Sequence, residues 1–122
     1  MKILVVDDSS TMRRIISNIL KSNGHEDIVE ATDGLEGLSQ LKAHPEIGLV
    51  LTDWNMPNMN GLEFLTKVRE TTPAAKLPVV MVTTEAEKAN VVAALKAGAS
   101  NYIVKPFTPE VVKSKLESFL KK

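Results

Sequence analysis

The sequence predicts an α/β protein built on a doubly wound parallel sheet. Short runs rich in β-branched residues alternate about five times with longer segments of helical period. Each strand–helix unit has roughly the 20–30 residues that one crossover needs, and right-handed helical crossovers join parallel strands. The 122 residues contain no linker, repeat or low-complexity segment. We therefore expect one domain over residues 1–122, a three-layer sandwich with helices on both faces of the sheet.

Five short apolar runs are the predicted strands, at residues 3–6, 28–31, 49–52, 79–82 and 102–104. The first is apolar at every position, which is typical of a strand covered on both faces. Residues that begin or end helices stand between the runs. They are Ser9 or Ser10, the pair Asn23-Gly24, Asp33, the pair Asn60-Gly61, Gly98 and Pro109.

Apolar residues at helical spacing predict which face of each helix packs on the sheet. The expected inward residues are, in chain order, Met12, Ile15, Ile16, Ile19 and Leu20, then Leu35, Leu38 and Leu41, then Leu62, Leu65 and Val68, then Val91, Val92 and Leu95, then Val112, Leu116, Phe119 and Leu120. The bases Arg13, Arg14 and Lys21 indicate the solvated face of the first helix.

Charge and composition exclude several classes of function. Lys plus Arg is 15 and Asp plus Glu is 15, so the net charge is zero, and nothing favours nucleic acid or an anionic membrane as a partner. The absence of cysteine excludes disulfides, thiol catalysis and thiolate metal sites. No apolar stretch is long enough to span a bilayer, and the N-terminus lacks a signal-peptide pattern. We expect a cytoplasmic, monomeric protein without membrane insertion.

Polar residues follow four of the predicted strands. Asp7 and Asp8 come after the first, Asp53 after the third, Thr83 after the fourth and Lys105 after the fifth. Ligands of doubly wound sheets bind beyond the carboxyl ends of the strands, so these side chains gather at one edge. Three carboxylates repel one another unless a cation offsets their charge. Oxygen ligands without His or Cys favour Mg²⁺, with Mn²⁺ as the other candidate.

This combination of groups is typical of an aspartyl phosphate site. A carboxylate beside Mg²⁺ can accept a phosphoryl group, and Lys105 and Thr83 can supply the ammonium and hydroxyl that contact its oxygens. Each residue alone has a simpler interpretation. An Asp after a strand is often a helix cap or turn residue, as Asp33 is. Lys105 alone would be a solvated surface group, Thr83 a strand-end hydroxyl with a local backbone bond, and Tyr102 a partly buried strand aromatic.

Four segments carry a resemblance to a known family. They are VVDDSSTMRR at 5–14, TDWNMPNMNG at 52–61, MVTTE at 81–85 and AGASNYIVKPF at 97–107. At these positions, and over essentially its full length, the chain resembles the response-regulator receiver domains, and among them the single-domain regulators of chemotaxis. The resemblance implies the flavodoxin-like (βα)5 fold with the parallel sheet order 2-1-3-4-5, which periodicity alone does not give.

The resemblance also implies the roles of the site residues. Asp53 matches the aspartate that accepts the phosphoryl group, and Lys105 matches the lysine that contacts it. The peptide bond between Lys105 and Pro106 matches one that is cis in the family, although composition alone favours trans. The ligands of Mg²⁺ would be the side chains of Asp8 and Asp53, the backbone carbonyl of Asn55 and, mainly through water, Asp7.

Further positions are implied to control the switch. Thr83 matches the switch hydroxyl, and Tyr102 matches the aromatic that turns inward on activation. Asn55 and Glu85 occupy the two positions that tune dephosphorylation, and both are polar, so we expect a short-lived phosphoryl group. Thr84 departs from the best-known chemotaxis regulators, which carry a smaller residue there.

The resemblance implies partners as well. The phosphoryl donor would be a CheA-like histidine kinase, and the target a FliM-like flagellar switch protein. The expected target-binding face includes Ala86, Val91, Tyr102 and Lys115. Because no output domain follows the fifth helix, output would be protein binding and not catalysis. The only chemistry expected is autophosphorylation from small donors and autodephosphorylation.

Other functions remain open from the sequence. A receiver in another phosphorelay, or one acting as a phosphate sink, would carry the same site. A magnesium-dependent phosphatase of the haloacid-dehalogenase kind also forms an aspartyl phosphate, but its nucleophile follows the first strand in an Asp-x-Asp pattern, unlike Asp7-Asp8-Ser9. A flavodoxin-like nucleotide binder would need a Gly-rich first turn, where this chain has acids.

Overall fold

Five parallel strands form one sheet in the computed structural model, which describes residues 1–71 and 76–120. The strands are β1 (Lys2–Val6), β2 (Ile28–Ala31), β3 (Ile47–Thr52), β4 (Val79–Thr83) and β5 (Asn101–Val104). Their order across the sheet is β2-β1-β3-β4-β5, which confirms the order implied by the resemblance. Every predicted strand is present, and four of them are one or two residues longer than expected.

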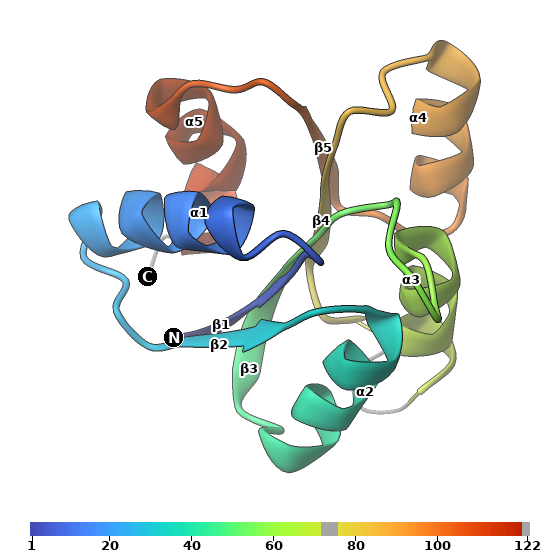
Figure 1. The fold of residues 1–122 in the computed structure, drawn as a ribbon, viewed down its shortest axis with the longest axis horizontal. Helices are drawn as coiled ribbons and strands as arrows, with labels where there is room; N and C mark the ends of the chain where they lie inside the picture. Colours follow the sequence, from blue (N-terminus) through green and yellow to red (C-terminus); the bar gives the residue numbers. More distant parts are fainter. Residues whose placement is uncertain (72–75, 121–122) are drawn as a thin grey trace.

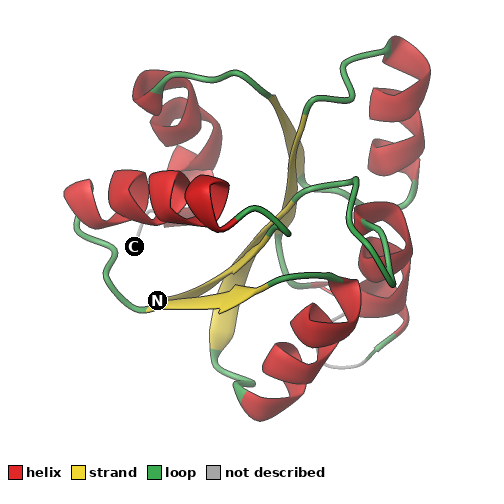
Figure 2. Cartoon of the chain, in the orientation of Figure 1, coloured by secondary structure: helices red, strands yellow, loops and turns green. Residues whose placement is uncertain are grey.

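Five helices connect and follow the strands in the described residues. They are α1 (Ser10–Ser22), α2 (Gly34–Ala43), α3 (Gly61–Glu70), α4 (Lys88–Lys96) and α5 (Pro109–Leu120). Helices α1 and α5 cover one face of the sheet, and α2, α3 and α4 cover the other (Figure 1; Figure 2). The doubly wound three-layer sandwich is therefore confirmed. No helix in the described part of the chain is long and apolar enough to cross a membrane.

The side chains of β1 alternate between two hydrophobic cores. Ile3 and Val5 pack in the core under α1 and α5, whereas Leu4 and Val6 pack in the core under the other three helices. Successive side chains of a strand point to opposite faces, and all four are at most 1% exposed. Burial of one such side chain contributes about 1.5–3 kcal/mol. The first apolar run is thus a central strand covered on both faces, as predicted.

The register of the strands aligns their carboxyl ends. Val6 of β1 pairs with Thr52 of β3, so Asp7 and Asp53 are the next residues of neighbouring strands. The Asp53 N–H donates to the carbonyl of Val6 at 2.9 Å. On the other side of β3, Thr83 of β4 pairs with Val104 of β5. The residues that follow β1, β3, β4 and β5 therefore lie along one edge of the sheet.

The predicted helix signals act as caps. Ser9 accepts a hydrogen bond from the Met12 N–H, Asp33 from the Glu36 N–H, and Asn60 forms a capping box with Glu63. Such a cap contributes about 1 kcal/mol. Asn23 is the C-cap of α1, and Gly98 follows the end of α4 with a positive φ of 110°.

Four residues expected on inward helix faces are exposed instead. Ile15, Leu35, Val92 and Leu95 have exposed fractions between 38% and 52%. Small residues hold the inward positions in two of these helices, with Gly34 and Gly37 in α2 and Ala94 in α4. A Cβ on Gly37 would lie 2.9 Å from the Phe64 ring. Close packing selects the small residues, so helical spacing placed Leu35, Val92 and Leu95 inward wrongly. The other predicted residues of these two helices, Leu38, Leu41 and Val91, do pack against the core.

Candidate functional site

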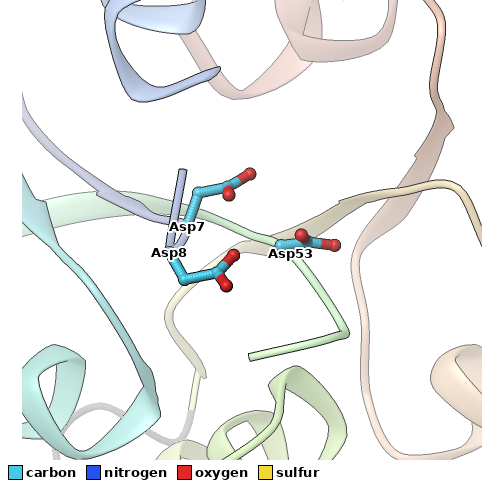
Figure 3. A group of neighbouring side chains, drawn as sticks. All are labelled: Asp7, Asp8 and Asp53. Atoms are coloured by element: carbon cyan, nitrogen blue, oxygen red, sulfur yellow. The ribbon is translucent and has the colours of Figure 1, made fainter. Parts of the chain in front are cut away.

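The three aspartates predicted to share a cation lie together at the carboxyl edge of the sheet. Asp7 and Asp8 follow β1, and Asp53 follows the adjacent strand β3. One carboxylate oxygen from each residue lies within 4.8 Å of the other two. Figure 3 shows the side chains gathered beyond the strand ends. No other group in residues 1–71 and 76–120 brings three metal-ligating side chains this close.

The acids differ in their exposure to solvent. Asp7 is 1% exposed and Asp53 9% exposed, whereas Asp8 is open to solvent. Burial raises the pKa of the Asp7 carboxyl, while hydrogen bonds from the Ser9 N–H and from Lys105 oppose this rise. Repulsion by Asp53 adds to the increase in pKa. The site therefore holds negative charge at a cost that a further cation would offset.

Lys105 provides the ammonium group of the site. Its Nζ lies 2.9 Å from Asp7 Oδ2 and 3.3 Å from Asp53 Oδ2. The backbone N–H of Lys105 donates to the carbonyl of Thr83 at 2.8 Å, which holds this residue at the end of β5. The bond to Pro106 is cis, as the resemblance implied. Lys105 is thus a partly buried ion-pair partner of two acids and not a solvated surface lysine.

The loop after β3 fixes the Asp53 side chain and its backbone. Asp53 Oδ1 accepts a hydrogen bond of 2.6 Å from the Trp54 N–H. The Gly61 N–H donates to the Trp54 carbonyl at 2.8 Å. A Cβ on Gly61 would overlap the Asp53 carbonyl oxygen, so the start of α3 approaches the acid as closely as only glycine allows.

Thr83 and Tyr102 meet at Glu85. Thr83 is fully buried, and its hydroxyl accepts from the Glu85 N–H at 3.3 Å. Tyr102 is also buried, and its hydroxyl donates to the Glu85 carbonyl. Burial raises the pKa of Tyr102, and the carboxylates of Glu85 and Asp53 add to this effect. The ring therefore lies inward, with its phenol proton held by the loop after β4. Thr84, in the same loop after β4, is exposed.

The two residues implied to tune dephosphorylation contact each other. Asn55 Nδ2 donates to Glu85 Oε2 at 2.9 Å. A third residue, Asn90 of α4, donates from Nδ2 to Glu85 Oε1 at 3.1 Å. Both carboxylate oxygens of Glu85 are thus held by amides. The contact with Asn90 has no signal in the sequence, because it depends on how α4 is placed.

Arg13 does not lie on a solvated face as predicted. Its side chain is 15% exposed, and its Nε forms a 2.7 Å ion pair with Glu30 Oε1 of β2. Its Nη1 donates to the backbone carbonyl of Asp7 at 2.6 Å. Arg13 therefore anchors the loop that carries the first two acids. Helical spacing missed it because the loop and β2 both fold over the first turn of α1.

The predicted target-binding residues differ in accessibility. Ala86 and Lys115 are exposed, Val91 is half-buried, and Tyr102 is buried. Sequence reasoning missed four exposed apolar residues on α4, β5 and α5. These are Val92, Leu95, Val104 and Val111. Val92 and Leu95 of α4 were assigned inward positions by their spacing, so the predicted target-binding face did not include them.

The residues present fit a hard divalent cation. The available ligand atoms are carboxylate oxygens, and the group contains no His or Cys. Oxygen ligands of this kind are the ones that Mg²⁺ and Mn²⁺ prefer. Two of the acids are buried and one is exposed, so the site is open on one side to solvent and to a phosphate group.

Comparison with known proteins decides the family. The family model described as "Response regulator receiver domain" matches residues 3–117. The chain belongs to the response regulator receiver family. It is 56% identical over 120 residues to the chemotaxis protein CheY1 of Helicobacter pylori, covering 98% of this chain and 97% of that protein. It is 57% identical to the CheY homolog of Campylobacter jejuni, with 98% and 92% covered.

Solved structures of receivers share the fold. The CheY4 structure of Vibrio cholerae is 34% identical, with a TM-score of 0.89 and 98% of both chains covered. The structure described as the CheX–CheY–BeF3–Mg²⁺ complex of Borrelia burgdorferi is 31% identical, with a TM-score of 0.92, covering 100% of this chain and 90% of that one. The receiver's flavodoxin-like sheet order is therefore common to this chain and to its relatives.

Proposed function

We propose that this receiver is a phosphorylation-controlled switch of chemotaxis. Asp53 accepts a phosphoryl group from a histidine kinase, and the phosphorylated form binds the flagellar motor switch. The observation that carries the proposal is the ion-paired site: Lys105 Nζ lies within 3.3 Å of acids from two strand ends. The pathway rests on relatives at 56–57% identity over almost their whole length, which are chemotaxis proteins named CheY.

Mg²⁺ would be held by Asp8, Asp53 and the backbone carbonyl of Asn55, with Asp7 acting mainly through water. When bound, the ion supplies positive charge shared between the acceptor carboxylate and the phosphoryl oxygens. The Borrelia relative with BeF3 and Mg²⁺ named in its complex supports this assignment. Mn²⁺ has the same preference for oxygen ligands and would replace it.

The proposed transfer step uses the side chains gathered at the strand ends. An Asp53 carboxylate oxygen attacks the phosphorus of a phosphohistidine, and the phosphorus–nitrogen bond breaks, so its electron pair returns to the imidazole. Lys105 and Thr83 then contact oxygens of the phosphoryl group. Attack of water on the phosphorus reverses the modification, with the electron pair of the cleaved phosphorus–oxygen bond returning to Asp53. Positioning and charge stabilisation dominate such chemistry.

Output depends on the loop that joins the site to the far surface. The Thr83 hydroxyl and the Tyr102 phenol both contact Glu85, so a phosphoryl group that recruits Thr83 changes the balance between two arrangements of this loop. The target face would comprise Ala86, Val91, Tyr102 and Lys115 together with the exposed apolar residues of α4, β5 and α5. A CheA-like kinase and a FliM-like switch protein are the proposed partners.

A peptide-binding measurement tests the proposed function. The N-terminal peptide of a FliM-like protein is titrated into the receiver with Mg²⁺, with and without beryllofluoride as a phosphoryl mimic. We expect at least a tenfold gain in affinity with the mimic, which corresponds to about 1.4 kcal/mol of coupling. The Asp53→Asn variant should show no gain. Equal affinity in both states would place the receiver in another phosphorelay or make it a phosphate sink.

We also propose that the protein turns over no external phosphate ester. The only hydrolysis would be that of its own aspartyl phosphate. Steady release of phosphate from a general ester such as p-nitrophenyl phosphate, dependent on Mg²⁺ and lost in Asp53→Asn, would instead indicate a phosphatase.

A further inference from the structure

Glu85 is the point where four hydrogen bonds meet. Its N–H donates to the Thr83 hydroxyl at 3.3 Å, and its carbonyl accepts from the Tyr102 hydroxyl. Its two carboxylate oxygens accept from Asn55 at 2.9 Å and from Asn90 at 3.1 Å. Three of these partners belong to the proposed switch. Asn90 is the fourth, and it is the partner that comes from α4.

The first turn of α4 differs from those of the preceding helices. The caps of α1, α2 and α3 accept hydrogen bonds from the first turn through their side chains, whereas Glu87, the N-cap of α4, makes no such bond. Asn90 lies in that first turn and reaches back to Glu85, two residues before the cap. The contact joins two side chains, so it caps no backbone N–H of the first turn, but it ties the helix to the loop that follows β4.

Asn55 alone holds the Glu85 carboxylate weakly. Asn55 is exposed, and holding an exposed side chain in one rotamer costs conformational entropy. A single hydrogen bond leaves the Glu85 carboxylate free to rotate about χ3, the torsion whose distribution is broad in glutamate. The second amide, from a residue on a helix, fixes both oxygens and so defines the plane of the carboxylate.

We propose that Asn90 is a positioning residue for loss of the phosphoryl group from Asp53. It acts through Glu85, whose carboxylate it holds together with Asn55, two residues after the acceptor. Glu85 would in turn orient the attacking water. This inference rests on the proposed function and deepens it, because it assigns control of the phosphoryl lifetime to a residue of the helix that bears the target face. Misplacement of an orienting group by about 1 Å slows a reaction by up to ~100-fold.

Paired substitutions test the inference. Asn90→Ala removes the donor and keeps a good helix former, and Asn90→Asp places a second carboxylate against Glu85. In Glu85→Gln with Asn90→Asp, the Gln oxygen can accept from Asn55 and the Gln amide can donate to the new aspartate. Each protein is labelled with acetyl phosphate and Mg²⁺, and loss of the phosphoryl group is followed after removal of the donor. Lys88→Ala, exposed in the same turn of α4, is the matched control.

We expect slower loss of the phosphoryl group in both single variants of Asn90, by about 3- to 10-fold, with Asn90→Asp slower than Asn90→Ala. The double variant should return to the rate of Glu85→Gln alone. The affinity for Mg²⁺, read from Trp54 fluorescence, and the midpoint of unfolding should stay at the wild-type values, and Lys88→Ala should match wild type throughout.

Three results would overturn the inference. Wild-type rates of loss in Asn90→Ala and Asn90→Asp would show that Asn90 does not position Glu85. Failure of Glu85→Gln to rescue Asn90→Asp, or a fall in Mg²⁺ affinity that parallels the change in rate, would show a general disturbance of the site. A wild-type protein that acquires no label would reject the proposed function itself, which separates that failure from a failure of the role of Asn90.

Discussion

The ammonium group of Lys105 lies closer to Asp7, at 2.9 Å, than to the proposed phosphoryl acceptor Asp53, at 3.3 Å. Asp7 is also the more deeply buried acid, and burial raises the pKa of its carboxyl. Lys105 therefore serves first as the counter-charge of Asp7. The carboxylates of Asp7 and Asp53 are also candidate ligands of a divalent ion. Lys105 and the ion would therefore share these two partners.

Lys105→Met should lower the stability of the metal-free protein at neutral pH by about 2 kcal/mol, because removing one partner leaves a buried carboxylate without its counter-charge. The loss should shrink as the pH falls and Asp7 becomes protonated. Urea denaturation at several pH values measures it. Lys67→Met, which removes a solvent-exposed ion pair on α3, should have little effect. Equal stability of Lys105→Met and wild type would contradict the assigned role.

Asp33→Ala should destabilise the fold by about 1 kcal/mol at neutral pH through loss of the α2 cap. Hydrogen bonds from the Glu36 N–H and from Asn58 hold the pKa of Asp33 below its ordinary value of 3.8. A carboxyl with a depressed folded pKa contributes stability above the unfolded pKa and loses it as the pH falls through the folded value. The difference between wild type and variant should therefore decrease below about pH 3.8, and a constant difference down to pH 2 would exclude a charge contribution.

Gly61→Ala should cost about 2–3 kcal/mol of stability, because the new methyl group would overlap the Asp53 carbonyl and force the loop away from α3. The same shift should weaken Mg²⁺ binding, which a Trp54 fluorescence titration reports. Gly24→Ala is the comparison, since a Cβ there meets no atom within 4 Å. It should change stability only through its positive φ and leave the Mg²⁺ titration unaltered. A Gly61→Ala protein with wild-type Mg²⁺ affinity would show that the loop tolerates the shift.

Leu95→Ala should weaken binding of the FliM-like peptide to the beryllofluoride form by about fivefold, because truncating an apolar contact residue costs on the order of 1 kcal/mol. Leu95 is 48% exposed, so stability should change little. Leu35→Ala offers a matched control on the far helix α2, where the leucine is 52% exposed. A loss of affinity in both variants, or in neither, would place the target elsewhere.

The elements of the fold were predictable because each has a local signal. Alternating apolar runs marked the strands, and Ser9, Asp33 and Asn60 marked the starts of helices. The strand order came from the resemblance, since pairing between distant strands leaves no trace in local periodicity. Leu35 and Leu95 were placed inward wrongly because the packing of α2 and α4 selects small residues, which hydrophobic spacing does not count.

The site was predictable to the extent that parallel strands bring their carboxyl ends together. Asp7, Asp8, Asp53 and Lys105 meet as expected for that reason. The anchoring of the Asp7 loop by Arg13 was not predictable, because it depends on the separation between α1 and β2. The contact of Asn90 with Glu85 likewise follows only from where the first turn of α4 lies. The roles of these residues in chemistry stay predictions that experiments decide.

The most direct test of the account is the site at which acetyl phosphate and Mg²⁺ label the protein. Reduction of the acyl phosphate with borohydride, followed by digestion and mass spectrometry, locates the modified residue. We expect one modified residue, Asp53, with labelling lost in Asp53→Asn and retained in Asp33→Asn, which changes another buried strand-end acid. Label on Asp7 or Asp8, or unchanged labelling of Asp53→Asn, would contradict the central claim.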